Sequence, residues 1–421
     1  MNQSVLIDID ALRVGMYIQL ELGWLNHPFP TSSFRLSSPE QIRVLRELGL
    51  RSVRYVPAKS MPVPAGTVGL AREAVAEGVD EDPDEGEAAA ADLLAQFKTR
   101  QDRCNQRFQQ ASRIYAAVSA GVQVEPLRAR GQAETLIRAC VADMLERGPC
   151  AVHLMVGSVG RNSAAHAVNV MVLALLLGRS LGLQEQQLLG LGVAALLHDL
   201  GKVGLPSHIG EPGAALMRAD MQRYQSHVGL SVELAQTMGL PSDVLIAIAQ
   251  HHEMANGSGY PLHLVAEDIS RWGQILALVN RYDRLCNPLH GEQALTPHEA
   301  VAKLFALLRE NFDASVLGAF IRQMGVYPPG SLVQLVDGRF AVVVIVDPGH
   351  ALRPGVIPYQ PDVPRSEAAL LNLARMPELG ILRSLKPAQL PRAALEYLLP
   401  QPRISYFFER ALGALDQGDV A

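Results

Sequence analysis

Apolar side chains recur every three or four residues through most of the chain between residues 93 and 311, and this periodicity restricts the fold more than any other feature. Such spacing gathers apolar side chains on one face of an α-helix. The segments that show it are 93–118, 133–146, 163–181, 185–198, 219–238, 242–251, 269–285 and 297–311. Because short, turn-rich connections separate these segments, we expect a single all-α domain that begins with a long helix.

Sequences of a different character flank this helical region. The acidic run EGVDEDPDEGE at residues 77–87 repels itself and buries little apolar area, so it is typical of a linker. Before it, residues 4–57 combine short β-rich runs with one capped helical stretch. After the helices, SLVQLV, the pair Asp337-Gly338 and RFAVVVIV predict a β-hairpin, and residues 366–421 look helical again.

We therefore predict a mainly α fold in four parts. A small α+β domain occupies residues 1–60, and an acidic, Pro/Gly-containing linker occupies residues 61–92. An all-α helical domain follows at residues 93–325. Residues 326–421 form a β-hairpin extension with a C-terminal helical tail.

Composition excludes several classes of protein. Hydrophobic residues make up 48% of the chain, which excludes global disorder. The net charge of −5 and the aromatic content of 5% do not favour DNA, RNA or anionic lipid as partners. The apolar run Val170–Leu177 is too short for the roughly 20 residues that span a bilayer. With four scattered cysteines and no signal peptide, we expect a cytoplasmic protein; the oligomeric state is left open.

Histidines carry the strongest chemical signal. His166 lies in an apolar helical stretch, and His227 lies further along the chain. Two pairs of adjacent residues accompany them: His198-Asp199 in AALLHDLGK, and His251-His252 before a Gly-rich turn. Imidazole nitrogens suit transition metals, and one carboxylate can bridge two ions. A two-metal site acidifies a water molecule and clamps a phosphodiester, for which Lys202 supplies a further cation.

Each of these histidines has an ordinary structural explanation. A lone histidine on an apolar helix, such as His166, is more often a hydrogen-bonded core residue than a ligand, and the same holds for His227. A buried Asp199 beside His198 is harder to explain in that way, because a buried charge needs partners. Taken together and in order, the residues favour a metal site.

At this point the sequence resembles the HD-GYP family, a branch of the HD metal-dependent phosphohydrolases. The resemblance covers about residues 150–325 and rests on HDLGK at 198–202, on His227, on HHE at 251–253 and on GSGYP at 257–261. The N-terminal segment LRVGMYIQLELGWLNHPF also resembles the small domain of unknown function that often precedes HD-GYP domains. The hairpin resembles the extension that usually follows them.

The resemblance implies hydrolysis of cyclic di-GMP to pGpG and GMP by an all-α domain that carries two or three iron or manganese ions. It implies that His198, Asp199 and Lys202 are catalytic. It implies metal ligands at His166, His198, Asp199, His227, His251, His252 and the position held by Asn280. The loop residues Gly257, Gly259, Tyr260 and Pro261 are implied to lie near the substrate and to contact diguanylate cyclases (GGDEF domains).

Four positions depart from the family pattern. Asn280 stands where the family has an aspartate ligand, so one negative charge is lost. Asp283, three residues further along a helix, points in a different direction and does not simply replace it. Asn162 stands where three-metal members have a glutamate, so we expect two ions. Leu289 and Glu292 stand where the family binds phosphate with arginines, and Arg284 is one residue that offers compensation.

Three functions remain open from the sequence. The first is a metal-dependent cyclic di-GMP phosphodiesterase, which the retained histidines favour. The second is a degenerate scaffold that binds other proteins without turnover, which Asn280 and Leu289 favour. The third is an HD phosphohydrolase that acts on another nucleotide.

Overall fold

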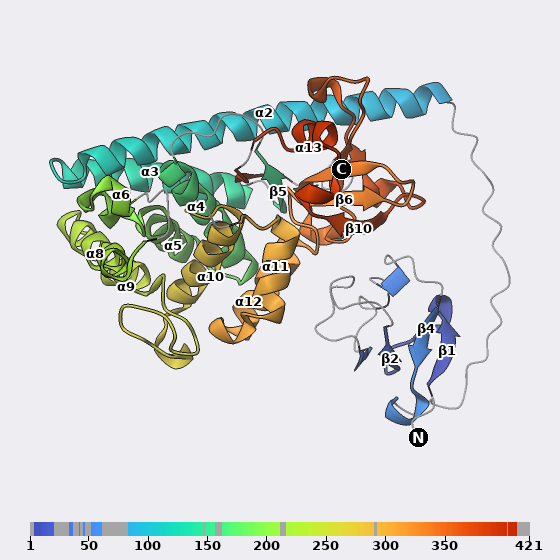
Figure 1. The fold of residues 1–421 in the computed structure, drawn as a ribbon, viewed down its shortest axis with the longest axis horizontal. Coiled ribbons are helices and arrows are strands. Elements are labelled where there is room, and N and C mark those ends of the chain that lie inside the picture. The colour runs from blue at the N-terminus through green and yellow to red at the C-terminus, as the bar shows by residue number, and fades with distance from the viewer. Residues whose placement is uncertain are drawn as a thin grey trace. The chain divides into compact units, whose positions relative to one another are not determined.

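A computed structural model describes residues 4–20, 33–36, 42, 45–46, 52–60, 83–146, 148–155, 162–210, 216–289, 293–401 and 403–410 (Figure 1). The chain divides into two compact units, Met1–Gln96 and Phe97–Ala421.

The N-terminal unit contains a four-stranded antiparallel sheet. Its strands are β1 (Val5–Asp8), β2 (Tyr17–Gln19), β3 (Ser33–Arg35) and β4 (Ser52–Tyr55), in the order β1-β4-β2-β3. Ile18 and Leu45 are fully buried in a small apolar core with Val53. The β component of the predicted α+β domain is therefore present, whereas the helical stretch expected before β4 falls mostly outside the described residues.

The second unit is predominantly helical, as predicted. Its α-helices are α2 (Pro83–Gly121, which enters from the first unit), α3 (Pro126–Glu146), α4 (Asn162–Ser180), α5 (Glu185–Leu197), α6 (Ser207–Gly210), α7 (Arg218–Gln225), α8 (His227–Thr237), α9 (Ser242–Gln250), α10 (Arg271–Cys286), α11 (Pro297–Ala306), α12 (Ala314–Met324) and α13 (Arg392–Leu398). The long helix expected from residue 93 begins earlier, at Pro83, inside the segment expected to be linker. Proline is favoured at the first helical position, and the acidic residues after it suit the positive end of the helix dipole.

Helix α4 is the centre of the helical core. Its residues from 164 to 178 are all buried, and it packs against α5, α10, α12 and strand β11 (Tyr406–Arg410). By length and composition the segment Ser163–Ser180 is apolar enough to cross a membrane, but 83% of it is buried inside the fold, as in the core helix of a globular domain. His166 is consequently held in the interior by the most buried helix in this unit.

A seven-stranded sheet lies at the C-terminal end of the second unit (Figure 1). Its strands are β5 (Cys150–Leu154), β6 (Leu332–Leu335), β7 (Phe340–Val346), β8 (Gly355–Pro358), β9 (Leu371–Asn372), β10 (Ile381–Leu385) and β11. The main order is β10-β6-β7-β5-β11, and β8 pairs with β7 and β9. Strand β5, which comes from the middle of the helical region, therefore joins the sheet to the helices.

The predicted hairpin is present as β6 and β7, which pair antiparallel across Asp337-Gly338. Gly338 has a φ of 89°, and the Arg339 N–H donates to Asp337 Oδ1 at 3.0 Å. The predicted helical tail over 366–421 is wrong for the described part of that range, where α13 is accompanied by β9, β10 and β11. Strand β11 is buried on both faces, and a continuous apolar run of this kind cannot be assigned to helix or strand by periodicity.

The segment 219–238, expected as one helix, is divided at Ser226 into α7 and α8. His227 therefore begins a helix instead of lying inside one. Just before this pair, the 3-10 helix η4 (Leu200–Gly204) packs closely against α8. The Gly201 N–H donates to Ser231 Oγ at 2.8 Å.

We expect Gly201→Ala to destabilise this contact. A β-carbon at residue 201 would lie 2.3 Å from the His227 carbonyl oxygen and 2.4 Å from the Ser231 backbone nitrogen, and neither backbone atom moves easily. The free energy of unfolding should fall by about 1–3 kcal/mol in urea denaturation. Gly229→Ala is the matched control, because that exposed helical glycine has nothing within 4 Å of an added β-carbon. It should be more stable than the parent by about 0.5–1 kcal/mol. Equal stability of the two variants would contradict the packing described here.

We expect His153 in β5 to make folding sensitive to acid. Neither of its ring nitrogens has a hydrogen-bond partner among the described residues, and burial lowers its pKa from 6.5 to about 3. The unfolded chain therefore takes up a proton at this residue before the folded chain does. His153 therefore costs no stability above pH 6.5. Below that pH its protonation in the unfolded chain lowers the free energy of unfolding progressively, until the pH reaches about 3.

The substitution His153→Leu should remove this loss. From pH 8 to pH 5 the stability of the variant relative to the parent should rise by about 2 kcal/mol. Urea denaturation of both proteins at the two pH values measures the difference. A constant difference at the two pH values would show that His153 does not titrate in this way.

Candidate metal centre

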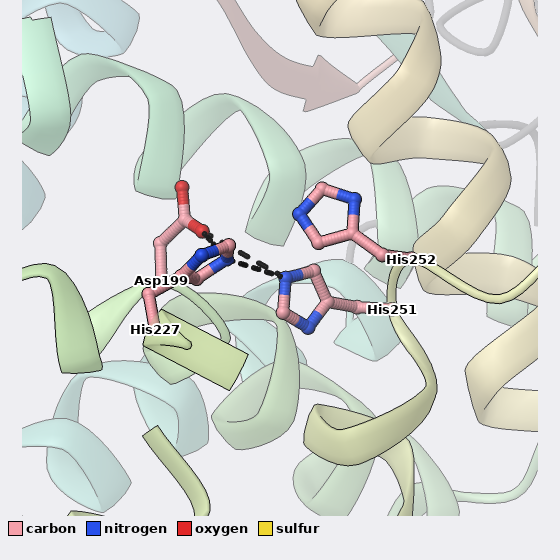
Figure 2. Close-up of side chains that lie close together, drawn as sticks. All are labelled: Asp199, His227, His251 and His252. Carbon is pink, nitrogen blue, oxygen red and sulfur yellow. Dashed lines mark hydrogen bonds and ion pairs between the residues drawn. The ribbon is translucent and has the colours of Figure 1, made fainter. Parts of the chain in front are cut away.

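Four separate parts of the helical unit bring the predicted histidines together. His166 comes from α4, His198 and Asp199 follow α5, His227 begins α8, and His251 and His252 follow α9. Their potential ligand atoms form two groups in which all atoms lie within 4.8 Å of one another. One group contains His166, His198 and Asp199; the other contains Asp199, His227, His251 and His252, which Figure 2 shows gathered around one point. Asp199 belongs to both groups.

Three of the histidines are oriented by the same local hydrogen bond. The Nδ1–H of His198 donates to the Ala195 carbonyl oxygen at 2.7 Å. The Nδ1–H of His227 donates to Tyr224 O, and that of His251 donates to Ile248 O, both at 2.6 Å. In each case the acceptor is the residue three positions earlier, in the last turn of a helix, where carbonyl groups lack helical partners. A carbonyl oxygen only accepts, so Nδ1 carries the proton and Nε2 presents its lone pair.

His166 is oriented by a carboxylate instead. Its Nδ1–H donates to Asp283 Oδ2 at 2.6 Å, and the other oxygen of Asp283 accepts from Asn169 Nδ2 at 2.7 Å and Asn287 Nδ2 at 2.9 Å. Asp283 is fully buried, and these bonds compensate for the loss of water. Burial raises the pKa of Asp283, but His166, Arg284 and Asn169 together hold the pKa below its usual value. Asp283 thus fixes the orientation of the His166 ring.

The free nitrogens face one another in a way that requires a cation. His166 Nε2 lies 3.2 Å from His198 Nε2, and His227 Nε2 lies 3.3 Å from His251 Nε2. Because Nδ1 carries the proton in all four rings, two lone pairs meet in each contact, and no hydrogen bond forms in the neutral state. Burial lowers the pKa of His198 to about 3 and also lowers the pKa values of His227, His251 and His252. Neutral imidazoles with converging lone pairs fit bound metal.

Asp199 joins the two groups of histidines through its two oxygens. Oδ1 lies 3.2 Å from His227 Nε2 and 3.8 Å from His251 Nε2. Oδ2 lies 3.4 Å from His166 Nε2 and 3.6 Å from His198 Nε2. Burial raises the pKa of this carboxyl group, but Lys202 and His198 hold the pKa well below its usual range. Asp199 is therefore ionised and lies between the two groups of histidines.

Two cations contact the same carboxylate. Lys202 Nζ lies 2.5 Å from Asp199 Oδ2, and its charge also lies 4.9 Å from the centre of the Tyr224 ring. Arg284 of α10 donates to Asp199 Oδ2 at 2.8 Å. The sequence predicts Lys202 as a phosphate contact, whereas it offers Arg284 only as a candidate for compensation. Its contact with Asp199 depends on the packing of α10.

Asn280 lies on the face of α10 that meets this site. It precedes Asp283 by three residues and Arg284 by four, and both of these contact site residues. Asn280 is 3% exposed, and its Oδ1 has no hydrogen-bond partner in the described part of the chain. A buried acceptor without a donor is costly, and a nearby cation would remove that cost. The position is compatible with a neutral oxygen ligand.

The GSGYP loop is held against the histidines by backbone contacts. A β-carbon on Gly259 would lie 2.4–2.6 Å from backbone atoms of residues 252–254, so only glycine fits there. The Tyr260 N–H donates to the His252 carbonyl oxygen at 3.2 Å, and the Tyr260 ring stacks on the His252 ring with centres 4.5 Å apart. Gly257 has a φ of 76°, and Pro261 follows Tyr260 through a cis peptide bond.

Glu253 holds the far side of this loop. Its two carboxylate oxygens accept the N–H groups of Leu262 at 2.6 Å and Leu264 at 2.9 Å. Glu253 is fully buried, so these two backbone donors take the place of water at its carboxyl oxygens. The sequence motif HHE included this residue, but only the structure shows that it supports the loop. Of the remaining departures, Leu289 is half-buried, and Glu292 lies outside the described residues.

Comparison with known proteins identifies two family models in the chain. The HD domain matches residues 152–316, and the domain of unknown function DUF3391 matches residues 4–133. The chain is 26% identical over 348 residues to the cyclic di-GMP phosphodiesterase PA4108 of Pseudomonas aeruginosa, which spans 80% of this chain and 81% of the relative. It is 28% identical to the 3'3'-cGAMP-specific phosphodiesterase 3 of Vibrio cholerae over 37% of this chain and 33% of the relative.

Among solved structures, the chain is similar to Bd1817, an HDG"Y"P protein from Bdellovibrio bacteriovorus, with 17% identity and a TM-score of 0.41. That match covers 76% of this chain and 98% of the other. The predicted resemblance is confirmed by the family models and the curated relatives together. The chain therefore contains an HD domain, preceded by a DUF3391 domain.

Proposed function

We propose that this protein is a metal-dependent phosphodiesterase that hydrolyses cyclic di-GMP to pGpG and GMP. The observation that carries the proposal is the convergence of five buried imidazoles on one ionised carboxylate. A protein that only bound partners would have no physical reason to hold unprotonated Nε2 atoms 3.2–3.3 Å apart. The similarity to a curated cyclic di-GMP phosphodiesterase along most of both chains supports this substrate.

The residues of this chain have separate tasks in the reaction. His166, His198, Asp199, His227, His251 and His252, with Asn280, would hold two divalent ions, for which iron and manganese suit the nitrogen and oxygen donors. When bound, such ions lower the pKa of water and withdraw negative charge from a phosphodiester. Lys202 and Arg284 add two cations beside Asp199, where they can stabilise the negative charge that develops on phosphate oxygens. Tyr260 covers His252 and limits access of water.

Two further parts of the proposal concern context. All four cysteines are buried thiols outside any disulfide, and a cyclic dinucleotide messenger is an intracellular substrate, so we place the protein in the cytoplasm. The loop beyond Tyr260 exposes Leu262 and Val265, with exposed fractions of 60% and 43%. This apolar edge is a candidate contact for diguanylate cyclase (GGDEF) domains.

A second cyclic dinucleotide is the main alternative substrate. The similarity to a 3'3'-cGAMP-specific phosphodiesterase favours it, although that match covers about a third of each chain. Both substrates present the same pair of phosphodiesters and differ in one base. Parallel assays with cyclic di-GMP and 3'3'-cGAMP, with added Mn²⁺ or Fe²⁺, decide between them by the ratio of kcat/KM.

The double substitution His198→Ala and Asp199→Ala should abolish both metal binding and turnover. It removes the bridging carboxylate and one imidazole while leaving α5 itself intact, so helix content measured by circular dichroism should be unchanged. His208→Ala is the control, because that histidine is exposed on α6. Chromatography of nucleotide products measures activity, and undiminished hydrolysis in the double variant would exclude the site.

Asn280→Asp should tighten metal binding. An added carboxylate supplies the negative charge that a neutral amide lacks, and we expect an affinity about ten-fold higher, the scale on which such changes act at metal sites. Titration of metal-free protein with Mn²⁺ measures the change. A weaker affinity in this variant would show that Asn280 does not face the ions.

A further inference from the structure

The two oxygens of Asp199 have different environments. Oδ2 accepts from Lys202 and from Arg284, at 2.5 and 2.8 Å. Oδ1 has no hydrogen-bond donor among the described residues, since the Nε2 atom of His227 that lies 3.2 Å away presents a lone pair. One side of the carboxylate is therefore already neutralised by protein cations, and the other side is not.

This difference divides the site into unequal halves. The three-histidine half consists of His227, His251, His252 and Asp199 Oδ1, and its orphaned atoms include Oδ1 and the Nε2 of His252. The two-histidine half consists of His166, His198 and Asp199 Oδ2. Asn280, the candidate oxygen ligand on the facing helix, brings no charge to either half. The only carboxylate oxygen in the two-histidine half is the one that both cations occupy.

Arg284 does not leave Oδ2 by losing a proton. A guanidinium stays charged at every physiological pH, so Arg284 can vacate the oxygen only by moving. The side chains of Lys202 and Arg284 are 11% and 16% exposed, so solvent screens their charges little. A divalent ion that used Oδ2, His166 and His198 would have to share an oxygen with two positive charges.

We propose that Arg284 controls the occupancy of the two-histidine half. A first divalent ion binds in the three-histidine half, and a second ion enters the two-histidine half only when the guanidinium leaves Asp199 Oδ2. This inference deepens the proposed function and rests on the same metal site. Until the second ion enters, the guanidinium occupies the position of a second cation at the bridging carboxylate.

Metal titration tests the proposal without any measurement of turnover. The full chain is stripped with a chelator and titrated with Mn²⁺, with free Mn²⁺ followed by electron paramagnetic resonance and bound metal counted by elemental analysis. The parent protein should bind one ion tightly and a second at least ten-fold more weakly. Arg284→Met should raise the affinity for the second ion by ten-fold or more and leave the first unchanged.

Two variants control for charge and for folding. Arg281→Met removes the same charge from an exposed position on the same helix, so both affinities should remain those of the parent. Arg284→Lys keeps a cation at the position, so the second ion should remain weakly bound. Circular dichroism and thermal unfolding verify that each variant is folded.

The outcomes separate this inference from the proposed function. Two ions of equal affinity in the parent protein overturn the inference, and so do identical titrations of Arg284→Met and Arg281→Met. Unequal sites that respond to Arg284 in a protein that hydrolyses no cyclic dinucleotide support the inference and reject the function. Binding of no Mn²⁺ by the parent rejects both.

Discussion

The hydrogen bond from a histidine Nδ1–H to the carbonyl oxygen three residues earlier is the interaction on which the whole site depends. It occurs at the ends of α5, α7 and α9, where the last carbonyl groups of a helix have no partner in the backbone. Each bond therefore completes a helix terminus and fixes an imidazole in one tautomer at the same time. Since three helices end around one point, three Nε2 lone pairs converge there without a flexible loop to position them.

Burial determines the charges of the groups in this arrangement. Rings packed away from water remain neutral, so their lone pairs repel one another, and the ionised Asp199 lies between them as the charge that both groups share. Asp283 behind His166 and Glu253 beneath the GSGYP loop are also buried, but hydrogen-bond donors already satisfy their oxygens. No donor among the described residues reaches Asp199 Oδ1, His252 Nε2 or Asn280 Oδ1, and these are atoms that a cation would satisfy.

Asn280 and Arg284 of α10 both change the electrostatic potential at the site in the same direction. An amide at residue 280 and a guanidinium at residue 284 each make the surroundings of Asp199 more positive than a carboxylate at the first position would. Both residues lie on one face of α10. The packing of that face against the neighbouring helices therefore brings both of them to the site. Of the described part of the chain, this helix is the one that most distinguishes the site from the pattern that its motifs resemble.

By itself the sequence determined the mainly α class, the hairpin at Asp337-Gly338 and the residues of the candidate metal centre. These depend on local signals: a helical period, a turn pair that tolerates positive φ, and residue types that prefer metal. It did not determine that β5 and β11 complete a sheet with the hairpin, because an apolar run buried on both faces has no period to read.

Nor did the sequence determine that Asp283 fixes His166, that Glu253 holds the loop, or that Arg284 reaches Asp199. Each of these contacts joins segments that are distant in sequence or depends on the face a helix presents to its neighbours. Local sequence fixes the side chain and its helix, whereas the rotation of α10 against α4, which buries its apolar face, decides which charges meet.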